Sequence, residues 1–284
     1  MRAYLDCFPC FLSQTLKTSR LITSDEEKIR HILNKVSLLF PKIPKYATPP
    51  EIGREVYRVI GEETGVIDPY REIKKKCIEQ ALSLYSEMKE IISSSKDKLL
   101  TAIRLSIAGN VIDFGANPDF ELREDINKIL TQELKICHYR EFCEILRKAK
   151  KILYLADNAG ETVFDRLLIE ELGKSVIYVV REKPVINDAT MEDAHLSGIH
   201  EVAEVISSGC DAPGTILKFC SEEFLEVYKS SDLIISKGQG NYEGLSDEPY
   251  PIFFLLKAKC SIIAHDIGVK EGDIILLKAK NYSI

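Results

Sequence analysis

The pattern of apolar and polar positions along the chain changes near residue 150. Before that point, apolar residues recur every three to four positions, as they do along one face of an amphipathic helix. This spacing predicts helices over residues 23–40, 50–65, 70–92 and 97–115, with further helical patterns between residues 121 and 149. Residues 1–148 are therefore expected to form a helical N-terminal domain.

After residue 150, short apolar runs with many β-branched residues alternate with helical patterns. The predicted strands lie at residues 151–156, 175–180, 201–207, 232–237, 260–265 and 273–278. Helical patterns fill most of the gaps, at residues 161–173, 215–229 and 250–259. This alternation is typical of an α/β fold with a mostly parallel sheet and helices on both faces. Residues 149–284 are therefore expected to form an α/β domain.

Composition narrows the classes of partner. The 284 residues carry a formal net charge of −6, and no long run of Lys or Arg occurs. Nucleic acid is therefore not expected as the main partner, because binding along a duplex needs a basic surface. No apolar run approaches the roughly 20 residues of a membrane span, and the first residues lack the apolar stretch of a signal peptide. A cytoplasmic protein is expected, while the oligomeric state is left open.

Polar side chains follow four of the predicted strands, at the point where each strand ends. They are Asp157 and Asn158 after the first strand, Arg181, Lys183, Asn187 and Asp188 after the second, Ser207, Ser208 and Asp211 after the third, and Lys237, Gln239, Asn241 and Glu243 after the fourth. Ligands of open α/β sheets bind in the crevice beyond the carboxyl ends of the strands. Turns are polar in most proteins, but four such loops together favour one shared site.

The oxygen atoms of Asp157, Asn158 and Asp188 form a hard set of candidate metal ligands. Such a set suits Mg²⁺ or Mn²⁺ better than zinc, which prefers His and Cys, and no histidine lies in these loops. Gly160 and Glu161 open the next predicted helix, whose free N–H groups favour an anion. Lys237 adds a positive charge for a phosphate. Taken alone, Asp157-Asn158 would be read more simply as a helix N-cap.

Several common nucleotide and hydrolase motifs are missing from the chain. There is no Walker A loop, and the glycines of "GQGNYEG" have the wrong spacing for a dinucleotide fingerprint. The stretch "DNAG" is not the Asp-x-Asp pattern of haloacid dehalogenase phosphatases, and no Gly-x-Ser-x-Gly elbow occurs. These absences disfavour the corresponding enzyme classes.

Five motifs resemble those of one family. They are CFPC at residues 7–10, AGNVIDFG at 108–115, ADNAGE at 156–161, REKPVINDAT at 181–190 and SKGQGNYE at 236–243. On these motifs the chain resembles the metal-dependent damage-control phosphatases, which were long described only as a domain of unknown function and include acidic-residue methyltransferase-like proteins. The N-terminal Cys-x-x-Cys is similar to that of compact microbial members.

The resemblance implies a helical N-terminal domain beside a Rossmann-like α/β domain. It implies a divalent metal ion held by Asp157, Asn158 and Asp188, with Lys237 contacting the substrate phosphate. Members of the family hydrolyse small phosphate esters, often sugar phosphates or damaged metabolites, and Mn²⁺, Co²⁺ or Ni²⁺ often supports their activity. Because specificity does not transfer across the family, the natural substrate is left open.

Two pairs of motif residues have structural as well as functional interpretations. Cys7 and Cys10 lack the preceding strand of a thioredoxin-like motif and the second ligand pair of a zinc site. They are interpreted as a structural or redox-labile thiol pair, with a role near the active site as the alternative. Asn110 and Asp113 share one helical face near Gly115. They either belong to the end of the helix or, as the family motif favours, face the cleft.

The leading hypothesis is a metal-dependent phosphomonoesterase that acts on a small phosphorylated metabolite. The residues expected to bind its phosphate are Gly160, Glu161, Lys237 and Asn241, with Asn187 and Asp211 as further cleft candidates. A metal-ligating carboxylate, or Asp211, is expected to accept the proton of water. Two alternatives stay open. One is an S-adenosylmethionine-dependent carboxyl methyltransferase with Glu182 on the ribose, and the other is a non-catalytic protein that binds phosphorylated metabolites.

Overall fold

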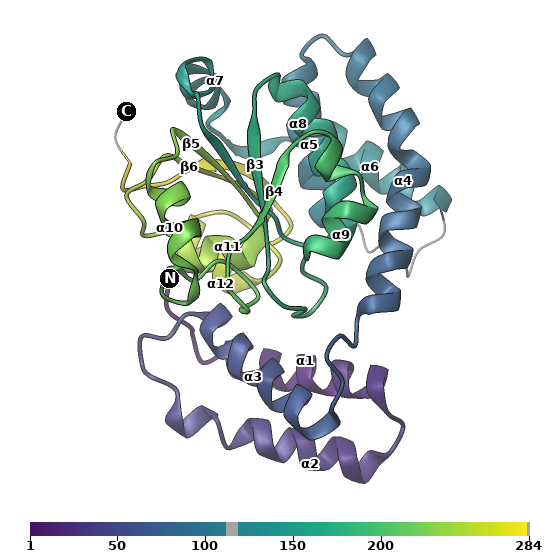
Figure 1. Ribbon diagram of the computed structural model, residues 1–284, viewed down its shortest axis with the longest axis vertical. Helices are drawn as coiled ribbons and strands as arrows, with labels where there is room; N and C mark the ends of the chain where they lie inside the picture. The colour runs from purple at the N-terminus through teal and green to yellow at the C-terminus, as the bar shows by residue number, and fades with distance from the viewer. Residues whose placement is uncertain (112–118, 283–284) are drawn as a thin grey trace.

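A seven-stranded sheet lies at the centre of the computed structural model, which describes residues 1–111 and 119–282 (Figure 1). The strands are β1 (Leu134–Cys137), β2 (Ile152–Leu155), β3 (Val176–Val180), β4 (Glu204–Ser207), β5 (Leu233–Lys237), β6 (Ile252–Lys257) and β7 (Ile274–Lys278). Their order across the sheet is β1-β7-β6-β5-β2-β3-β4. The strands from β6 to β4 are parallel, whereas β7 runs antiparallel to β6 and parallel to β1. The predicted fold class, α/β with a mostly parallel sheet, is confirmed.

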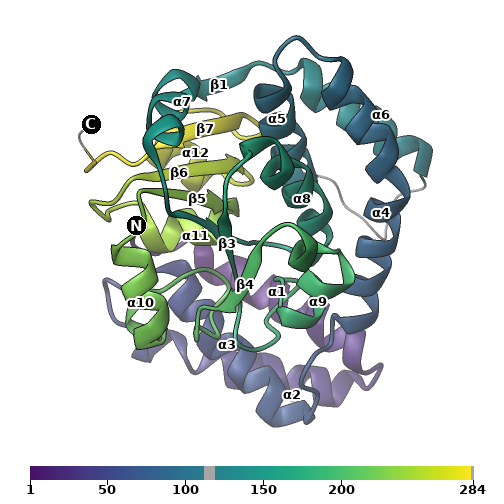
Figure 2. The ribbon, with the colours of Figure 1, turned by 45° about the horizontal axis from the view of Figure 1, so that its top comes forward.

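Helices cover both faces of this sheet (Figures 1 and 2). The helices whose buried side chains share a core with one face are α4 (Arg71–Ser94), α5 (Lys98–Val111), α6 (Asp119–Thr131), α7 (Tyr139–Lys148), α8 (Thr162–Leu172) and α9 (Met191–Leu196). Those of the other face are α10 (Glu222–Lys229), α11 (Gly238–Leu245) and α12 (Ser261–Ile267). Short 3₁₀ helices lie at η1 (Phe40–Lys42), η2 (Ala159–Glu161), η3 (Ile199–Glu201) and η4 (Leu217–Phe219).

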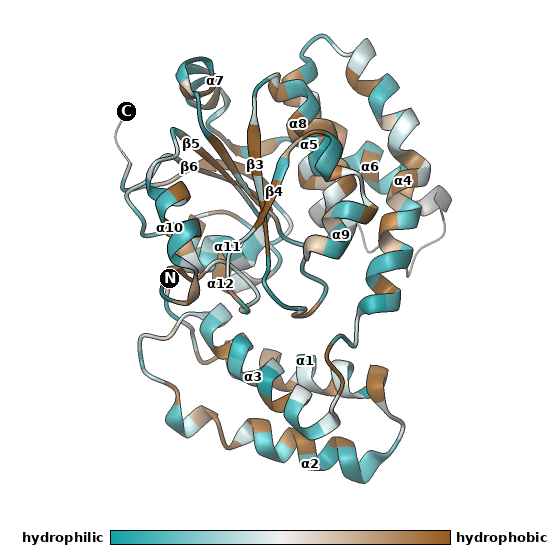
Figure 3. Ribbon diagram, viewed as in Figure 1, coloured by the Kyte–Doolittle hydropathy of each residue, from teal (hydrophilic) through white to brown (hydrophobic). Residues whose placement is uncertain are grey.

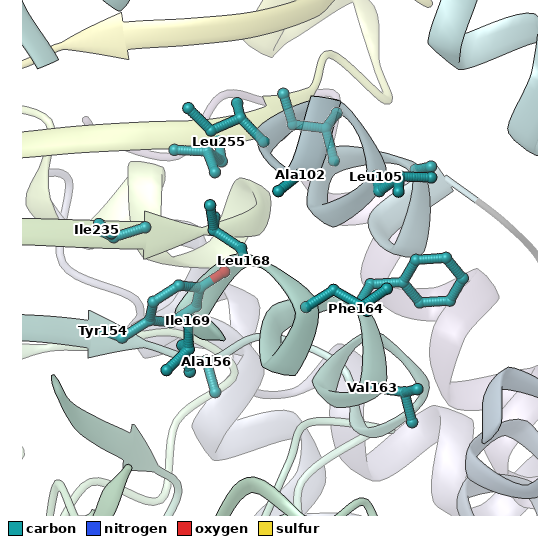
Figure 4. Packing of buried hydrophobic residues seen from close by; sticks show 14 of the residues in the cluster. Ala102, Leu105, Tyr154, Ala156, Val163, Phe164, Leu168, Ile169, Ile235 and Leu255 are labelled. Carbon is teal, nitrogen blue, oxygen red and sulfur yellow. The ribbon is translucent and has the colours of Figure 1, made fainter. Parts of the chain in front are cut away.

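The larger core lies between the sheet and the pair α5 and α8. Figure 4 shows Tyr154 of β2, Ile235 of β5 and Leu255 of β6 pointing toward Leu168 of α8 and Ala102 of α5, and all five side chains are buried. The central strands are covered on both faces, so their sequences are nearly continuous apolar runs. Figure 3 shows these strands as the most hydrophobic part of the ribbon, with polar residues on the outer faces of the helices.

The first helices form a smaller core of their own. They are α1 (Cys7–Ile22), α2 (Glu26–Ser37) and α3 (Pro49–Thr64), and residues such as Phe11, Ile32 and Val56 pack between them. Thr48 and Glu51 form a capping box at the start of α3, which fixes where that helix begins. The proposed division of the chain at residue 148 stays a prediction. The structure shows that α4 to α7 share the core of the sheet, whereas α1 to α3 do not.

The structure corrects three secondary-structure predictions. Residues 250–259, expected as a helix, contain the strand β6, and residues 260–265, expected as a strand, lie at the start of α12. Residues 134–137, within the part expected to be helical, form the strand β1. In the first case a run of ten residues looked long enough for a helix, but Ile252–Leu256 are all buried because the strand is covered on both faces.

No helix in the described ranges is long and apolar enough to cross a bilayer.

Candidate active site

A cavity of about 480 Å³ lies between the first helices and the carboxyl ends of the central strands. The strand order reverses at β2, since β3 and β4 follow it on one side and β5 and β6 on the other. Such a switch point is where α/β sheets bind ligands. One wall of the cavity comes from α1 and α3 with the residues that precede them, including Asp6, Cys7, Cys10, Phe11, Gln14 and Pro50. The opposite wall comes from the segments that follow β2, β3, β4, β5 and β6.

The structure brings Asp157, Asn158 and Asp188 together at the floor of this cavity, with Asn187 beside them. The loops after β2 and β3 are joined by their backbones. Ala189 N donates to Asp157 O at 2.8 Å, Ala159 N donates to Asn187 O at 2.8 Å, and Asn158 forms a β-bridge with Asp188. These bonds align the two strand ends, so side chains far apart in sequence reach one point.

The buried carboxylates of this group repel one another. Burial raises the pKa of Asp157 well above its ordinary value, and the nearby charges of Glu161 and Asp188 raise it further. Burial also raises the pKa of Asp188, although Arg181 opposes the shift. Asn158 Nδ2 donates to Asp157 Oδ2 at 3.2 Å and also to Glu161. The NH₂ group of Asn158 therefore lies between two carboxylates. A rotation of about half a turn about the last side-chain bond would place Oδ1 there instead.

This donor set fits a hard divalent cation. A cation between Asp157 and Asp188 would relieve the repulsion that raises the pKa of Asp157, and carboxylate and amide oxygens suit Mg²⁺ or Mn²⁺. Within residues 1–111 and 119–282, no group of three or more His, Cys, Asp and Glu side chains is placed to hold a metal ion. A set of two carboxylates and one amide would leave the other positions to water and substrate, as Mg²⁺ sites often do.

Arg181 forms an ion pair with Asp188 and does not itself line the cavity. Its side chain is 1% exposed, and its Nε donates to Asp188 Oδ2 at 2.7 Å. The rest of the guanidinium donates to Thr215 Oγ1 and to Asn241 Oδ1, each at 3.0 Å. Asn241, which was expected to bind phosphate, is buried in this network and donates to Ala156 O and Lys237 O. In this structure Asn241 supports Arg181 and does not line the cavity.

Lys237 is also directed away from the cavity. Its Nζ is completely buried and donates to Asp165 Oδ1 at 2.6 Å, Ser106 O at 2.8 Å and Glu161 Oε2 at 3.0 Å. Alternate residues of a strand share a face, so Lys237 points with Leu233 and Ile235 toward α5 and α8. Removing one partner of a buried ion pair typically costs about 3–5 kcal/mol. Contact with a phosphate, as expected from the sequence, would require Lys237 to leave two buried carboxylates.

The other predicted site residues lie in different places. Glu161 is buried and joins Lys237 to Asn158, while Gly160 is buried in the turn η2 and does not line the cavity. Asp211 accepts from Arg54 Nη2 of α3 at 3.2 Å and likewise lies outside the cavity lining. Asp113 and the side chain of Asn110 lie outside the described residues.

Sequence reasoning missed two residues that shape the polar end of the cavity. Gly238 has φ of 76°, and a Cβ there would lie 1.9 Å from Asp157 Oδ2, so only glycine fits. Its place directly after a strand in "SKGQG" was an available signal. Lys259 is exposed, lines the cavity, and lowers the pKa of Asp157 against the larger effect of burial. It was missed because residues 250–259 were taken for a helix and not for a strand with a loop at its end.

Three cysteines belong to the two walls of the cavity. Cys7, Cys10 and Cys260 line the cavity together with Glu243 and Gln239. Burial raises the pKa of the Cys7 thiol, with smaller effects from Glu243, Cys10 and Cys260. Burial also raises the pKa of Glu243 to about 7, although Gln239 Nε2 donates to its Oε1 at 2.9 Å. The N-terminal Cys-x-x-Cys therefore lies beside the candidate active site.

The backbone is strained next to Asp188. Ile186 lines the cavity with φ of 46°, and it is the one non-glycine residue with positive φ among those that the structure describes. A β-branched residue in this region is a genuine outlier, and such strain costs of order 1–3 kcal/mol. The loop that carries Asn187 and Asp188 is thus held in a conformation that its own sequence disfavours.

Comparison with known proteins gives a match over nearly the whole chain. Residues 3–275 match the model of the damage-control phosphatase ARMT1-like domain. Damage-control phosphatases of Pyrococcus horikoshii and Archaeoglobus fulgidus are each 35% identical, over 99% and 95% of this chain and 99% and 96% of their own lengths. An uncharacterized protein of Methanocaldococcus jannaschii is 40% identical over 96% of this chain and 94% of its own.

A solved structure shares the fold at the same level of similarity. The crystal structure of a DUF89 family protein from Pyrococcus horikoshii superposes with a TM-score of 0.91 at 34% identity. The match covers 99% of this chain and 100% of that one. The helices α1 to α3 and the sheet therefore occur together in both proteins.

Proposed function

The chain belongs to the ARMT1-like damage-control phosphatase family, and from that premise we propose that it hydrolyses small phosphate monoesters with the help of a divalent metal ion. The observation that carries the proposal is the group of Asp157, Asn158 and Asp188, two buried carboxylates and a half-buried amide, at the switch point of the sheet. The substrate is a small phosphorylated metabolite, such as a sugar phosphate or a damaged metabolite, because the cavity measures only about 480 Å³.

The metal would be held by Asp157, Asn158 and Asp188, with Mn²⁺ or Mg²⁺ as the expected ion and Co²⁺ or Ni²⁺ as alternatives. Bound there, it would polarise a phosphoryl oxygen and lower the pKa of a water molecule. The protein's own residues fix the geometry. Arg181 holds Asp188 at 2.7 Å, and Glu161 holds the amide of Asn158. A carboxylate that faces the cavity accepts the proton of the attacking water.

Particular residues disfavour the two alternative functions. A methyltransferase was expected to hold a ribose through Glu182, but Glu182 Oε2 accepts from Ser207 Oγ at 2.6 Å and does not line the cavity. A non-catalytic binder of phosphorylated metabolites would not need two repelling carboxylates on the cavity floor. The charge arrangement at Asp157 and Asp188 favours hydrolysis over both.

Phosphate release by wild type and Asp157→Asn, each with Mn²⁺ and with a chelator, tests the proposal. The substitution keeps the size of the side chain but removes a charge that holds the cation, so turnover of a generic phosphate ester should fall by several orders of magnitude. Asp211→Asn is the matched control, because that carboxylate pairs with Arg54 outside the cavity. The proposal is wrong if both variants release phosphate at the wild-type rate, or if release by wild type survives the chelator.

A further inference from the structure

We propose that Cys210 and Cys220 form a redox modification site, at which a small disulfide compound such as oxidised glutathione converts the two thiols into a bridge. Neither cysteine lines the candidate active site, so the proposal goes beyond the phosphatase function and does not depend on it. The two thiols are in contact with each other, and Pro213, which lies between them in the sequence, forms part of the cavity wall.

The backbone brings the two cysteines together. Cys210 lies three residues beyond the end of β4, and Cys220 directly follows η4. Next to them, Ser221 N donates to Ser208 O at 3.0 Å, and a Cβ at Gly209 would lie 2.6 Å from Ser221 N. Only neighbouring backbones can be bridged, because a disulfide needs Cα atoms within about 7 Å of each other. The two ends of this segment are therefore held side by side before any bond forms.

The sulfur atoms of the pair share a small apolar cluster with Ala212 and Ile216. While both thiols are protonated, Cys210 Sγ donates to Gly214 O at 3.5 Å and Cys220 Sγ donates to Ile216 O at 3.4 Å. Once Cys210 has lost its proton, the Cys220 thiol donates to it instead. Because Cys210 is buried and Cys220 is half-buried, a reagent in solvent reaches the pair through Cys220.

Cys210 is the more acidic thiol of the pair. The hydrogen bond from Cys220 lowers the pKa of Cys210 to about 6, although burial opposes the shift. The backbone N–H groups of Ala212 and Ile216 and the charge of Arg181 lower the pKa further. The same thiol–thiol bond raises the pKa of Cys220. At neutral pH the pair therefore carries one proton and one thiolate, which is the nucleophilic form in disulfide exchange.

The bridge forms by two exchange steps. The Cys220 sulfur attacks the external disulfide while its proton passes to Cys210, and the first thiolate of the reagent leaves. This thiolate takes the proton from Cys210, whose sulfur then attacks Cys220 and displaces the second thiolate. The two cysteines lose two electrons, and the reagent gains them and leaves as one thiol and one thiolate.

The chain between the two cysteines contacts both sides of the cavity. Asp211 accepts from Arg54 Nη2 of α3 at 3.2 Å, and Pro213 lines the cavity. Thr215 Oγ1 accepts from Arg181 Nη1 at 3.0 Å. A bridge at the ends of this segment would therefore restrain the part of the chain that joins α3 to the carboxyl ends of the strands.

Treatment of the folded protein with oxidised glutathione tests the proposal. After the remaining thiols are alkylated, peptide mass spectrometry should find Cys210 and Cys220 in one cross-linked species that lacks two hydrogen atoms. Dithiothreitol should restore both thiols. The Tm should be higher by roughly 5 °C in the bridged protein, because the bridge closes a loop in the unfolded chain.

Cys220→Ser is the matched variant, because it removes the bridge and keeps every other cysteine. Oxidised glutathione should not give this variant the rise in Tm that it gives wild type. The proposal is wrong if both thiols stay free in folded wild type, if each stays as a separate mixed disulfide with glutathione, or if the bridge forms only in urea. Each of these results would leave the proposed function standing, since phosphate release tests that separately.

Discussion

The side chain of Lys237 shows how direction within a strand decides what a residue can do. It ends β5 on the face of Leu233 and Ile235, so its ammonium enters the core and pairs with Glu161 and Asp165. Asp165 also accepts from Tyr154 Oη at 2.7 Å and Tyr178 Oη at 2.8 Å. Lys237 thus neutralises a buried polar network that reaches Asn158 through Glu161.

Replacing Lys237 should therefore destabilise the fold. Lys237→Met keeps the length of the side chain but leaves Glu161 and Asp165 without their cation, so the free energy of unfolding should fall by about 3–5 kcal/mol. Equilibrium unfolding in urea measures this, with Lys257→Ala as the control. A stable Lys237→Met protein that has lost only phosphate binding would instead support the role expected from the sequence.

Glu243 should make the stability of the fold fall as the pH rises. Burial raises its pKa from 4.5 to about 7, so the folded chain keeps a proton that the unfolded chain has already lost. Its effect on stability is most favourable below pH 4.5, weakens as the pH rises toward 7, and is constant above that. Between these two limits the free energy of unfolding changes by about 3 kcal/mol.

Glu243→Gln should remove this dependence, because the amide does not titrate. Comparing the unfolding free energies of wild type and Glu243→Gln at several pH values from 4.5 to 8 measures it. We expect the difference to shift in favour of the variant as the pH rises. A difference that does not change with pH would show that the pKa of Glu243 is not raised.

The meeting of Asp157, Asn158 and Asp188 in one cavity could be predicted from the sequence, whereas the residues that support them could not. Asp157, Asn158 and Asp188 were found because the end of a parallel strand fixes where a residue lies along the sheet. Whether a polar residue just beyond that end turns toward the cavity or into the core depends on partners distant in sequence. The side chain of Asn241 points into the core because its Oδ1 accepts hydrogen bonds there from Arg181 and Thr215.

At the scale of elements, the error that most changed the predicted site lies between residues 250 and 267. The sequence predicted a helix and then a strand there, whereas the structure has a strand and then a helix. The strand β6 and the helix α12 are both short and apolar, and periodicity alone does not separate a fully buried strand from a buried helix. The six-residue β6 occupies a central place in the sheet, between β5 and β7. That error hid Lys259, which shows that one misplaced strand can remove a residue from a predicted site.

The helix α3 contains two glycines in different surroundings, and they give a matched pair of predictions. A Cβ at Gly61 would meet only Val66 O at 3.8 Å, whereas a Cβ at Gly53 would lie 2.7 Å from Pro213 Cγ. Gly61→Ala should raise the free energy of unfolding by about 0.5–1 kcal/mol through helix propensity. Gly53→Ala should lose this gain to overpacking, which costs about 1–3 kcal/mol.

Thermal unfolding of both variants checks the pair. Gly53→Ala should also change KM, because Pro213 lines the cavity and must move away from α3 to admit the methyl group. Equal stabilisation by both substitutions would mean that α3 shifts freely against the loop that carries Pro213.

At the scale of the whole molecule, the cavity lies where two separately packed cores meet. The core of α1 to α3 forms one wall, and the sheet with its helices forms the other. Arg54 of α3 reaches across to Asp211, and Gly53 packs on Pro213. The distance between the cores is therefore fixed by specific contacts close to the site.

A metal ion bound at the cavity floor should stabilise the whole fold. At about 100 times its dissociation constant, a ligand that binds only the folded state adds about 2.7 kcal/mol. Differential scanning calorimetry should show that Mn²⁺ raises the Tm of wild type and Asp211→Asn by several degrees. Asp157→Asn should lose this increase, and an equal increase in that variant would place the metal elsewhere.

The left-handed backbone of Ile186 has a consequence for protein engineering. Asparagine tolerates this conformation far better than a β-branched residue does. A library selected for heat resistance would therefore enrich Ile186→Asn, since that change releases the strain beside Asp188. The same change would hold the loop that carries Asn187 and Asp188 more firmly in place, which costs activity where turnover needs that loop to move. Selection for thermal stability and selection for turnover would then favour different residues at position 186. Variants chosen for one of these properties would lose some of the other.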